Sequence, residues 1–276
     1  VDFMSADGTP LERPVTRVDW DAETAEKGGY ETFMLKEIHE QPDAVAETIA
    51  DRTVRETGVD FGAEFDETLL RDARRIIIVA CGTSYHSGVF GRYAIQNWAR
   101  VPVGVDVASE FRYADPLVGP GDLVIGMTQS GETADTLAAM RLAQERGATV
   151  LAVTNVMGSQ ATRDSDAVAY TRAGQEIGVA ATKTFVCQVA VMFLLALRLA
   201  ELRGTLPPER IAVGNGSCEI LLAAAETMLE PGAEIVYAWP SFSMYPHLAA
   251  MTGARAVTVA LDADARHDLE AMLAEV

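Results

Sequence analysis

Apolar and polar residues alternate along most of the chain in blocks that are typical of strands followed by helices. Five short apolar runs, rich in Val, Ile, Leu and Ala, indicate buried strands. Between them, apolar residues recur at helical spacing. The strands are expected at residues 76–80, 103–107, 123–127, 149–153 and 167–170, and the helices at about 89–99, 134–146, 158–165 and 181–203.

This alternation predicts the fold class. Strands that are apolar throughout must be covered on both faces, and successive strand-helix units produce parallel strands. With right-handed crossovers, the result is an α/β fold, a three-layer αβα doubly wound parallel sheet. Gly147 is expected to cap the helix that ends at residue 146.

Two strand-to-helix junctions carry clusters of small polar residues. CGTSYHSG (81–88) follows the first strand, and TQSGETADT (128–136) follows the third. Backbone N–H groups at a helix start, the positive end of the helix dipole and nearby hydroxyls can together hold a phosphate without Lys or Arg. An ordinary polar helix cap is the other interpretation of each junction alone. Because both should lie at the carboxyl ends of parallel strands, together they favour one anion site.

The segments on either side of this region differ from it in pattern. Residues 1–20 are polar and carry Pro10 and Pro14, which predicts a linker. Residues 21–72 form a helical lead-in, in which Pro42 is expected to open a new helix. His39 has no Ser, Cys or metal-spaced partner beside it, so a structural role is expected.

Residues 73–204 then form the main domain, and a second small β-α unit is expected at 205–276. Pro207 and Pro208 break the chain before the strand-helix pattern resumes. We expect three parallel strands there. The strands are expected at about 210–213, 234–238 and 255–261, and the helices at 218–229, 243–252 and 266–275.

Composition excludes several classes of function. The chain has 40 acidic and 22 basic residues and a net charge of −18, which argues against a nucleic-acid or anionic-membrane surface. Its 3 cysteines are far apart, with neither a disulfide framework nor metal-ligand spacing, which suits a cytoplasmic location. The most apolar run, Val189 to Leu197, is too short to span a bilayer and predicts a buried helix. Residues 1–14 lack the pattern of a signal peptide.

The order of four motifs carries a resemblance to a known family. CGTSYHSG, ASEFRY (108–113), TQSGETADT and EIGVAATKTF (176–185) resemble the first sugar-isomerase (SIS) domain of glucosamine-6-phosphate synthases, the isomerizing glutamine:fructose-6-phosphate aminotransferases, over residues 19–204. Ala181 stands where that family usually has a serine whose hydroxyl reaches the sugar. The resemblance therefore implies that sugar binding is weaker by one hydrogen bond, about 1 kcal/mol. The resemblance implies that the sugar phosphate is held by Thr83, Ser84, Thr128, Gln129, Ser130 and Thr133, with Val179 and Ala180 lining the sugar.

The C-terminal segment resembles a different family. GNGSCEILL (214–222), EPGAEIVYAWPSFSMYP (230–246) and the stretch 251–273 are similar to histidinol-phosphate aminotransferase, a fold-type I enzyme that uses pyridoxal phosphate. The resemblance implies that Gly216, Ser217 and Cys218 face the cofactor phosphate and that Phe242 stacks on its ring. Cys218 stands where that family usually has aspartate. A role in packing is the other explanation for Phe242. No lysine follows Lys183, so we expect no bound pyridoxal phosphate.

Three functional hypotheses remain open. The first is hexose phosphate binding, of the fructose 6-phosphate or glucosamine 6-phosphate type, without full catalysis. The synthase family takes its acid and base from a second SIS domain, and its ammonia from a glutaminase domain, neither of which is matched here. Glu132 is expected to cap the helix that follows it, and Lys183 either offsets phosphate charge or is solvated.

The second hypothesis is a complete isomerizing transaminase or a histidinol-phosphate aminotransferase, as in the two parent families. The third is a recombined chain, natural or engineered, with a structural role only. Whether the chain is an enzyme stays open between them. A homodimer or higher homo-oligomer, with elements that could be exchanged, is the expected assembly.

Overall fold

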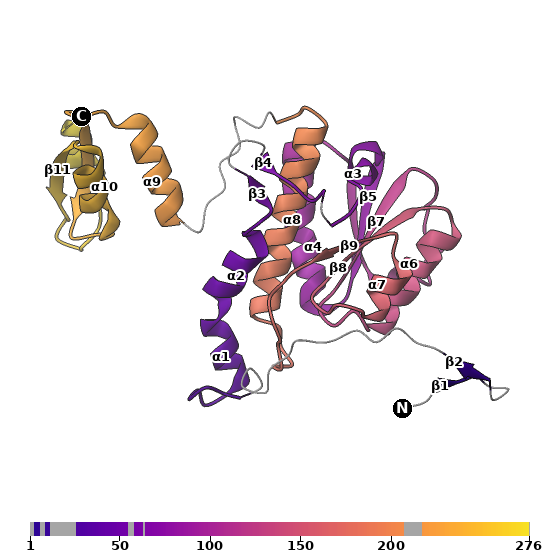
Figure 1. Cartoon of the computed structure of the whole chain (residues 1–276). Coiled ribbons are helices and arrows are strands. Elements are labelled where there is room, and N and C mark those ends of the chain that lie inside the picture. The colour runs from indigo at the N-terminus through magenta and orange to yellow at the C-terminus, as the bar shows by residue number, and fades with distance from the viewer. Residues whose placement is uncertain are drawn as a thin grey trace.

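The computed structural model describes residues 3–5, 9–11, 26–54, 58–62, 64–206 and 217–275. Its centre is a sheet of five parallel strands in the order β6-β5-β7-β8-β9. Strands β5, β7, β8 and β9 of this sheet are labelled in Figure 1. The five strands predicted from the apolar runs are all present, and the α/β fold class is confirmed. Their bounds are β5 (Arg75–Ala80), β6 (Val103–Val107), β7 (Asp122–Thr128), β8 (Thr149–Thr154) and β9 (Ala167–Tyr170).

Alternate residues of the central strands face two separate cores. Ile76 and Ile78 of β5 belong to one cluster of buried side chains, and Ile77 and Val79 belong to the other. This is the period of two expected of a strand buried on both sides. One face is covered by α2 (Gln41–Ile49), α4 (Gly82–Ala94), the π-helical turn η2 (Ile95–Ala99) and α8 (Lys183–Leu202), and the other by α5 (Ala108–Phe111), α6 (Ala134–Glu145) and α7 (Gln160–Asp164).

Helix α4 corrects one prediction. The sequence pattern placed its start near residue 89, but the helix begins at Gly82. The first turns carry Gly, Thr and Ser, whose small polar side chains give no apolar spacing, so the pattern began only where the helix meets the core. Thr83 and Ser84 therefore lie in the first turn of a helix and not in a loop before it.

Helix α8 is the one described helix that is long and apolar enough to cross a membrane by length and composition. Half of its most apolar window is buried within the molecule. Its residues Val191, Met192 and Leu195 pack into the core of the sheet. The prediction of a buried core helix is confirmed.

The lead-in segment packs α2 against α8, as Figure 1 shows. Thr32 caps the first helix by accepting a hydrogen bond from the backbone N–H of Leu35 at 3.1 Å. Pro42 lies at the start of the second helix, as predicted. The elements of this segment are α1 (Phe33–His39), α2, β3 (Thr53–Val54), β4 (Gly58–Val59) and α3 (Thr68–Asp72), preceded by the antiparallel pair β1 (Phe3–Met4) and β2 (Pro10–Leu11) in the stretch that was expected to be an irregular linker.

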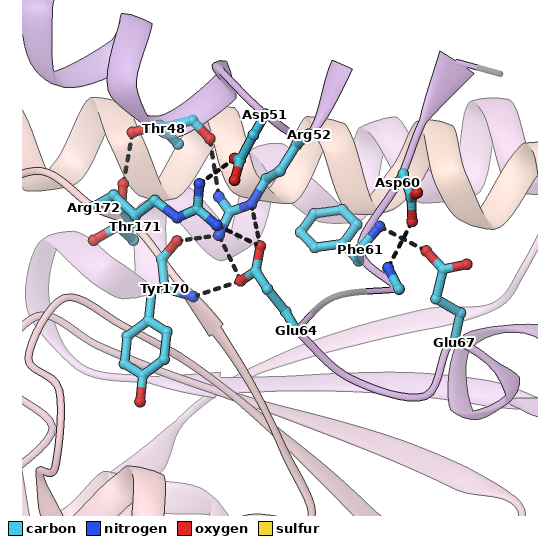
Figure 2. A network of polar contacts seen from close by, with 11 residues as sticks. Thr48, Asp51, Arg52, Asp60, Phe61, Glu64, Glu67, Tyr170, Thr171 and Arg172 are labelled. Atoms are coloured by element: carbon cyan, nitrogen blue, oxygen red, sulfur yellow. Dashed lines mark hydrogen bonds and ion pairs between the residues drawn. The ribbon is translucent and has the colours of Figure 1, made fainter. Parts of the chain in front are cut away.

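A buried ion-pair network joins the lead-in to the last strand of the sheet (Figure 2). Arg52, only 1% exposed, donates to both carboxylate oxygens of Glu64 at 2.6 and 2.7 Å. The same guanidinium donates to the carbonyl oxygens of Thr48 and Tyr170. Arg172 adds ion pairs to Glu64 and Asp51. The network therefore fixes the carboxyl end of β9, from which the chain continues into residues 171–182.

The C-terminal unit, described by itself, contains a two-stranded parallel sheet. Two of the three strands predicted for it are present, and the first, at 210–213, lies outside the described residues. The helix predicted at 266–275 is shorter and spans Leu269–Ala274. The elements are α9 (Ser217–Met228), β10 (Glu234–Trp239), α10 (Met244–Thr252), β11 (Arg255–Ala260) and α11 (Leu269–Ala274).

Candidate functional site

The strand order places a switch point between β5 and β7. The chain leaves β5 to form β6 on one side and returns to form β7 on the other side. Helices α4 and α6 consequently diverge to opposite faces of the sheet. In open parallel sheets, ligands bind in the crevice that such a divergence opens at the carboxyl ends of the strands. The two polar junctions recognised in the sequence both lie at this point.

The junction between β7 and α6 is held in shape by its own hydroxyls. Thr128 Oγ1 accepts a hydrogen bond from the N–H of Gly131 at 3.2 Å and lies 2.9 Å from Thr133 Oγ1. Ser130 Oγ accepts from the N–H of Glu132 at 3.2 Å. Gly131 has φ of 71°, and a Cβ there would overlap the side chain of Ser159. The loop therefore needs glycine at this position.

Exposure separates the residues of this junction into two groups. Thr128 is buried, so its hydroxyl builds the loop. Gln129 and Ser130 are half-buried, and the side chain of Ser130 can still turn to a ligand. The carbonyl of Gln129 accepts from the N–H of Asn155 at 3.2 Å, which ties the loop to the end of β8.

Helix α4 offers an open N-terminus at the second junction. Cys81 stands at the N-cap with no side-chain capping bond, and the first turn carries no acidic residue. Gly82 has φ of 58°. Thr83 is exposed and Ser84 is buried just beneath it. The first N–H groups of a helix have no partner within the helix and form its positive end, so an anion is stabilised there.

The other two long helices that begin near this edge already carry a negative charge at their start. Asp135 lies in the first turn of α6 and forms an ion pair with Arg112 at 2.8 Å. Glu176 accepts from the backbone N–H of Thr182 at 2.8 Å and from the Thr184 hydroxyl, and so caps α8. Of these three helices, α4 has the start best suited to an anionic ligand.

The segment that was expected to line the sugar is tied to the same edge. Asn155 donates to the carbonyl of Gly174 at 2.6 Å and accepts from the N–H of Ala173 at 2.8 Å. Since the N–H of Asn155 also donates to Gln129, Asn155 links the β7–α6 junction to the start of this segment. Beyond it, Val179 and Ala180 are exposed to solvent. The structure therefore brings the start of this segment to the edge that carries the two polar junctions, whereas among the described residues no hydrogen bond joins Val179 or Ala180 to these junctions.

Glu132 and Lys183 differ from their simplest expectations, whereas His39 agrees with its own. Glu132 caps α7 and not the helix that follows it, because its Oε1 accepts from the N–H of Gln160 at 2.8 Å. Lys183 is buried and pairs with Glu40 at 2.8 Å, so it is not a solvated helix lysine. His39 stacks on the ring of Tyr30 at 5.2 Å between centroids, which suits the structural role expected for it.

Two residues of this edge were not found from the sequence. No role was assigned to Asn155 or Glu37 from the sequence, because their partners lie far away in the chain. The only signal for Asn155 was its position directly after an apolar strand, where ligand-binding and loop-building residues gather in parallel sheets.

The C-terminal candidates form a weaker group. Cys218 is exposed on α9, and Phe242, 40% exposed, contacts Tyr245 edge to face at 5.7 Å. Gly216 and the side chain of Ser217 lie outside the described residues. The described part of this unit contains no lysine that could hold pyridoxal phosphate covalently. The residues present do not fit that cofactor.

Two hollows lie away from the phosphate junctions. One, of about 360 Å³, is lined by residues of the 62–71 stretch and Leu202. The other, of about 350 Å³, lies beside β6 and is lined by Asp106, Glu110 and Phe111 among others. Neither contains the predicted phosphate residues. A small anion held at a helix start needs no deep cavity, so the position of these hollows does not argue against a candidate site at the start of α4 and the β7–α6 junction.

Comparison with known families finds two matches in this chain. Residues 69–198 match the SIS domain, which covers the five-stranded sheet and most of its helices. Residues 190–276 give a weaker match to the aminotransferase class I and II family.

Similar curated proteins from different bacteria carry one name. The chain is 51% identical over 212 residues to a glutamine–fructose-6-phosphate aminotransferase (isomerizing) of Mycobacterium bovis, covering 76% of this chain and 34% of that protein. It is 48% identical over 230 residues to the protein of the same name from Clostridium acetobutylicum, covering 83% of this chain and 38% of that protein. The chain thus spans about a third of the length of the curated relatives it matches.

A solved structure is similar in both sequence and fold. The C-terminal domain of glucosamine-fructose-6-phosphate aminotransferase from Francisella tularensis is 31% identical, with a TM-score of 0.65, over 84% of this chain and 72% of that one. The likeness therefore extends over most of that domain. The chain belongs to the SIS-domain family, and its SIS domain is homologous to the isomerase domain of glucosamine-fructose-6-phosphate aminotransferase.

Proposed function

We propose that this SIS domain binds the phosphate group of a hexose phosphate at the junctions after β5 and β7. The observation that carries the proposal is the uncapped start of α4 at the switch point, beside the Thr128–Thr133 loop. The relatives' names support a substrate of the fructose 6-phosphate or glucosamine 6-phosphate type.

In this proposal, the exposure of each residue decides whether it contacts the ligand or holds the loop in shape. The N–H groups of the first turn of α4, with the hydroxyls of Thr83 and Ser130, contact the phosphate. Thr128 and Thr133 hold the second loop in shape through their mutual contact. Ser84 and Gln129 complete the site, and Val179 and Ala180 face the sugar.

We propose binding and not proton transfer for the described residues of this site. Enolisation of a ketose phosphate requires a base with a free lone pair close to the sugar. Glu132 and Glu176 both accept backbone N–H bonds at helix starts, which suits capping. The activity of the longer relatives, a two-fold dimer and a cytoplasmic location all stay predictions for this chain.

Calorimetric titration with fructose 6-phosphate, glucosamine 6-phosphate and inorganic phosphate tests the proposal. Thr83→Ala and Ser130→Ala should each weaken the binding of all three ligands by about tenfold, because each removes one hydrogen bond to a charged group. Thr149→Ala provides the matched control, since Thr149 is an exposed threonine at the opposite end of β8. Unchanged affinity in both site variants would place the ligand elsewhere.

A further inference from the structure

Helix α1 carries a buried carboxylate that contacts the segment beside the site. Glu37 is 2% exposed. Its Oε1 accepts hydrogen bonds from the backbone N–H groups of Ile177 at 2.6 Å and Gly178 at 3.0 Å. Hydrogen bonds from backbone N–H groups to an ionised carboxylate are stronger than neutral ones. A single side chain thus orients two successive peptide groups directly before Val179.

Gly178 is fitted closely to this carboxylate. A Cβ at this position would overlap Glu37 Oε2, which lies 3.2 Å from the Gly178 nitrogen. Its φ lies outside the left-handed region, so alanine is compatible with the backbone itself. The absence of a side chain at residue 178 is therefore explained by the approach of Glu37.

A second contact fixes the other end of the segment to the same helix. Glu40, at the C-terminal end of α1, pairs with Lys183 at 2.8 Å, and the lysine side chain is only 5% exposed. Residues 179–182 lie between these two attachments. Val179, within this short stretch, is nevertheless fully exposed. A fully exposed apolar side chain on a segment held at both ends is pre-organised to contact something outside it.

We propose that Glu37 is a positioning residue that fixes residues 177–180 against the sugar portion of the ligand, and that it thereby sets the preference for hexose phosphate over inorganic phosphate. This inference rests on the proposed function, because it takes the ligand to lie at the junctions after β5 and β7. Glu37 acts through the backbone of Ile177 and Gly178 and does not contact the ligand. The phosphate group is held by other elements, so its affinity does not depend on Glu37.

Two variants disturb the same contact from opposite sides. Glu37→Gln keeps the shape of the side chain but replaces the carboxylate with a neutral amide. Gly178→Ala leaves Glu37 unchanged but displaces its carboxylate. The matched control is Glu47→Gln, the same substitution at an exposed glutamate of α2.

Titration with two probes separates a positioning role from a general loss of structure. Each of the two variants should weaken the binding of fructose 6-phosphate by about tenfold, the equivalent of a charge-assisted bond reduced to a neutral one. Inorganic phosphate should bind all three variants as tightly as the parent chain. In the double variant, the loss should be no greater than in the more affected single variant, because both changes break one contact.

Hydrogen exchange of the ligand-free chain gives a second readout. The amides of Ile177 and Gly178 should exchange about tenfold faster in Glu37→Gln, while those of the central strands stay protected. Equal losses for both probes, or fructose 6-phosphate binding that is unchanged in both variants, would overturn the positioning role. Failure of the parent chain to bind either probe would instead overturn the proposed function, and with it the preference that rests on it.

Discussion

The body of the molecule, residues 26–206 around the five-stranded sheet, and the C-terminal unit, residues 217–275, are built from the same kinds of element. They differ in how those elements are covered. In β5, every residue after Arg75 is buried, because helices pack on both faces of a five-stranded sheet. In β11, no residue is fully buried and exposed positions dominate. A strand-helix alternation in the sequence thus specifies strands in both regions, but strands buried along their length on both faces only at the centre of the five-stranded sheet.

This difference decides where a site can be assigned. In the body, the ends of the strands are fixed by buried neighbours, so loops such as Thr128–Thr133 make defined hydrogen bonds among themselves. In the C-terminal unit, Cys218 is exposed and Phe242 only partly covered. A motif therefore indicates a binding site more strongly when the elements on either side of it are already buried.

The largest effect that tests this comparison concerns one ion pair in each region. Glu64→Ala should lower the free energy of unfolding of the body by roughly 3–5 kcal/mol, because it leaves the buried Arg52 without its partner. Glu234→Ala removes the partner of Arg255, whose side chain is 67% exposed, and should cost less than about 1 kcal/mol.

Urea unfolding monitored by hydrogen exchange reports on each region separately and measures the loss of unfolding free energy in both variants. The two variants are matched in chemistry and differ in burial. Equal losses in the two regions would show that burial does not distinguish them.

A smaller effect depends on pH. Burial disfavours the charged form of Asp122, but hydrogen bonds from Arg75 and the Gly119 N–H outweigh it and lower the pKa of this carboxyl. A lowered pKa in the folded state contributes stability above the unfolded pKa of about 3.9, and that contribution is lost as the pH falls through the folded pKa.

Asp122→Asn should therefore lower the free energy of unfolding by about 1 kcal/mol at pH 7, and the difference from the parent chain should shrink once the pH falls below the unfolded pKa of about 3.9. Urea midpoints measured between these pH values provide the test. Asp264→Asn, at an exposed aspartate of the C-terminal unit, is the control. A difference in unfolding free energy between Asp122→Asn and the parent chain that grows as the pH falls would contradict the lowered pKa of Asp122.

No effect is expected when pyridoxal phosphate is added to this chain. Its 3 lysines, Lys27, Lys36 and Lys183, all precede the C-terminal unit, and Lys183 is buried in an ion pair with Glu40. After incubation, borohydride reduction and removal of free cofactor, mass spectrometry should find no stoichiometric adduct on one lysine. Such an adduct would favour the aminotransferase interpretation of the C-terminal unit.

The sequence predicted the strands of the body well because four of them are nearly continuous apolar runs and β6 carries Val at every second position. It missed the start of α4, since residues 82–87 contribute mainly backbone groups and hydroxyls, which leave no apolar period. It also assigned Glu132 to the wrong helix, because its partner, the Gln160 N–H, is far away in the chain. Glu37 and Asn155 were missed for the same reason: a local pattern does not record which distant backbone groups a side chain meets.

The position of β5 in the sheet has a consequence for the order of assembly during synthesis. It is the first strand of the sheet to be made, yet it pairs with β6 on one side and β7 on the other. Strands β8 and β9 then add in chain order at one edge, so no later strand has to insert between two that are already paired. The face covered by α2, α4 and η2 stays incompletely covered until α8, the last helix of the body, is synthesised and packs against it. We therefore expect closure of that apolar face, and not pairing of the strands, to be the step that protects the nascent body from aggregation.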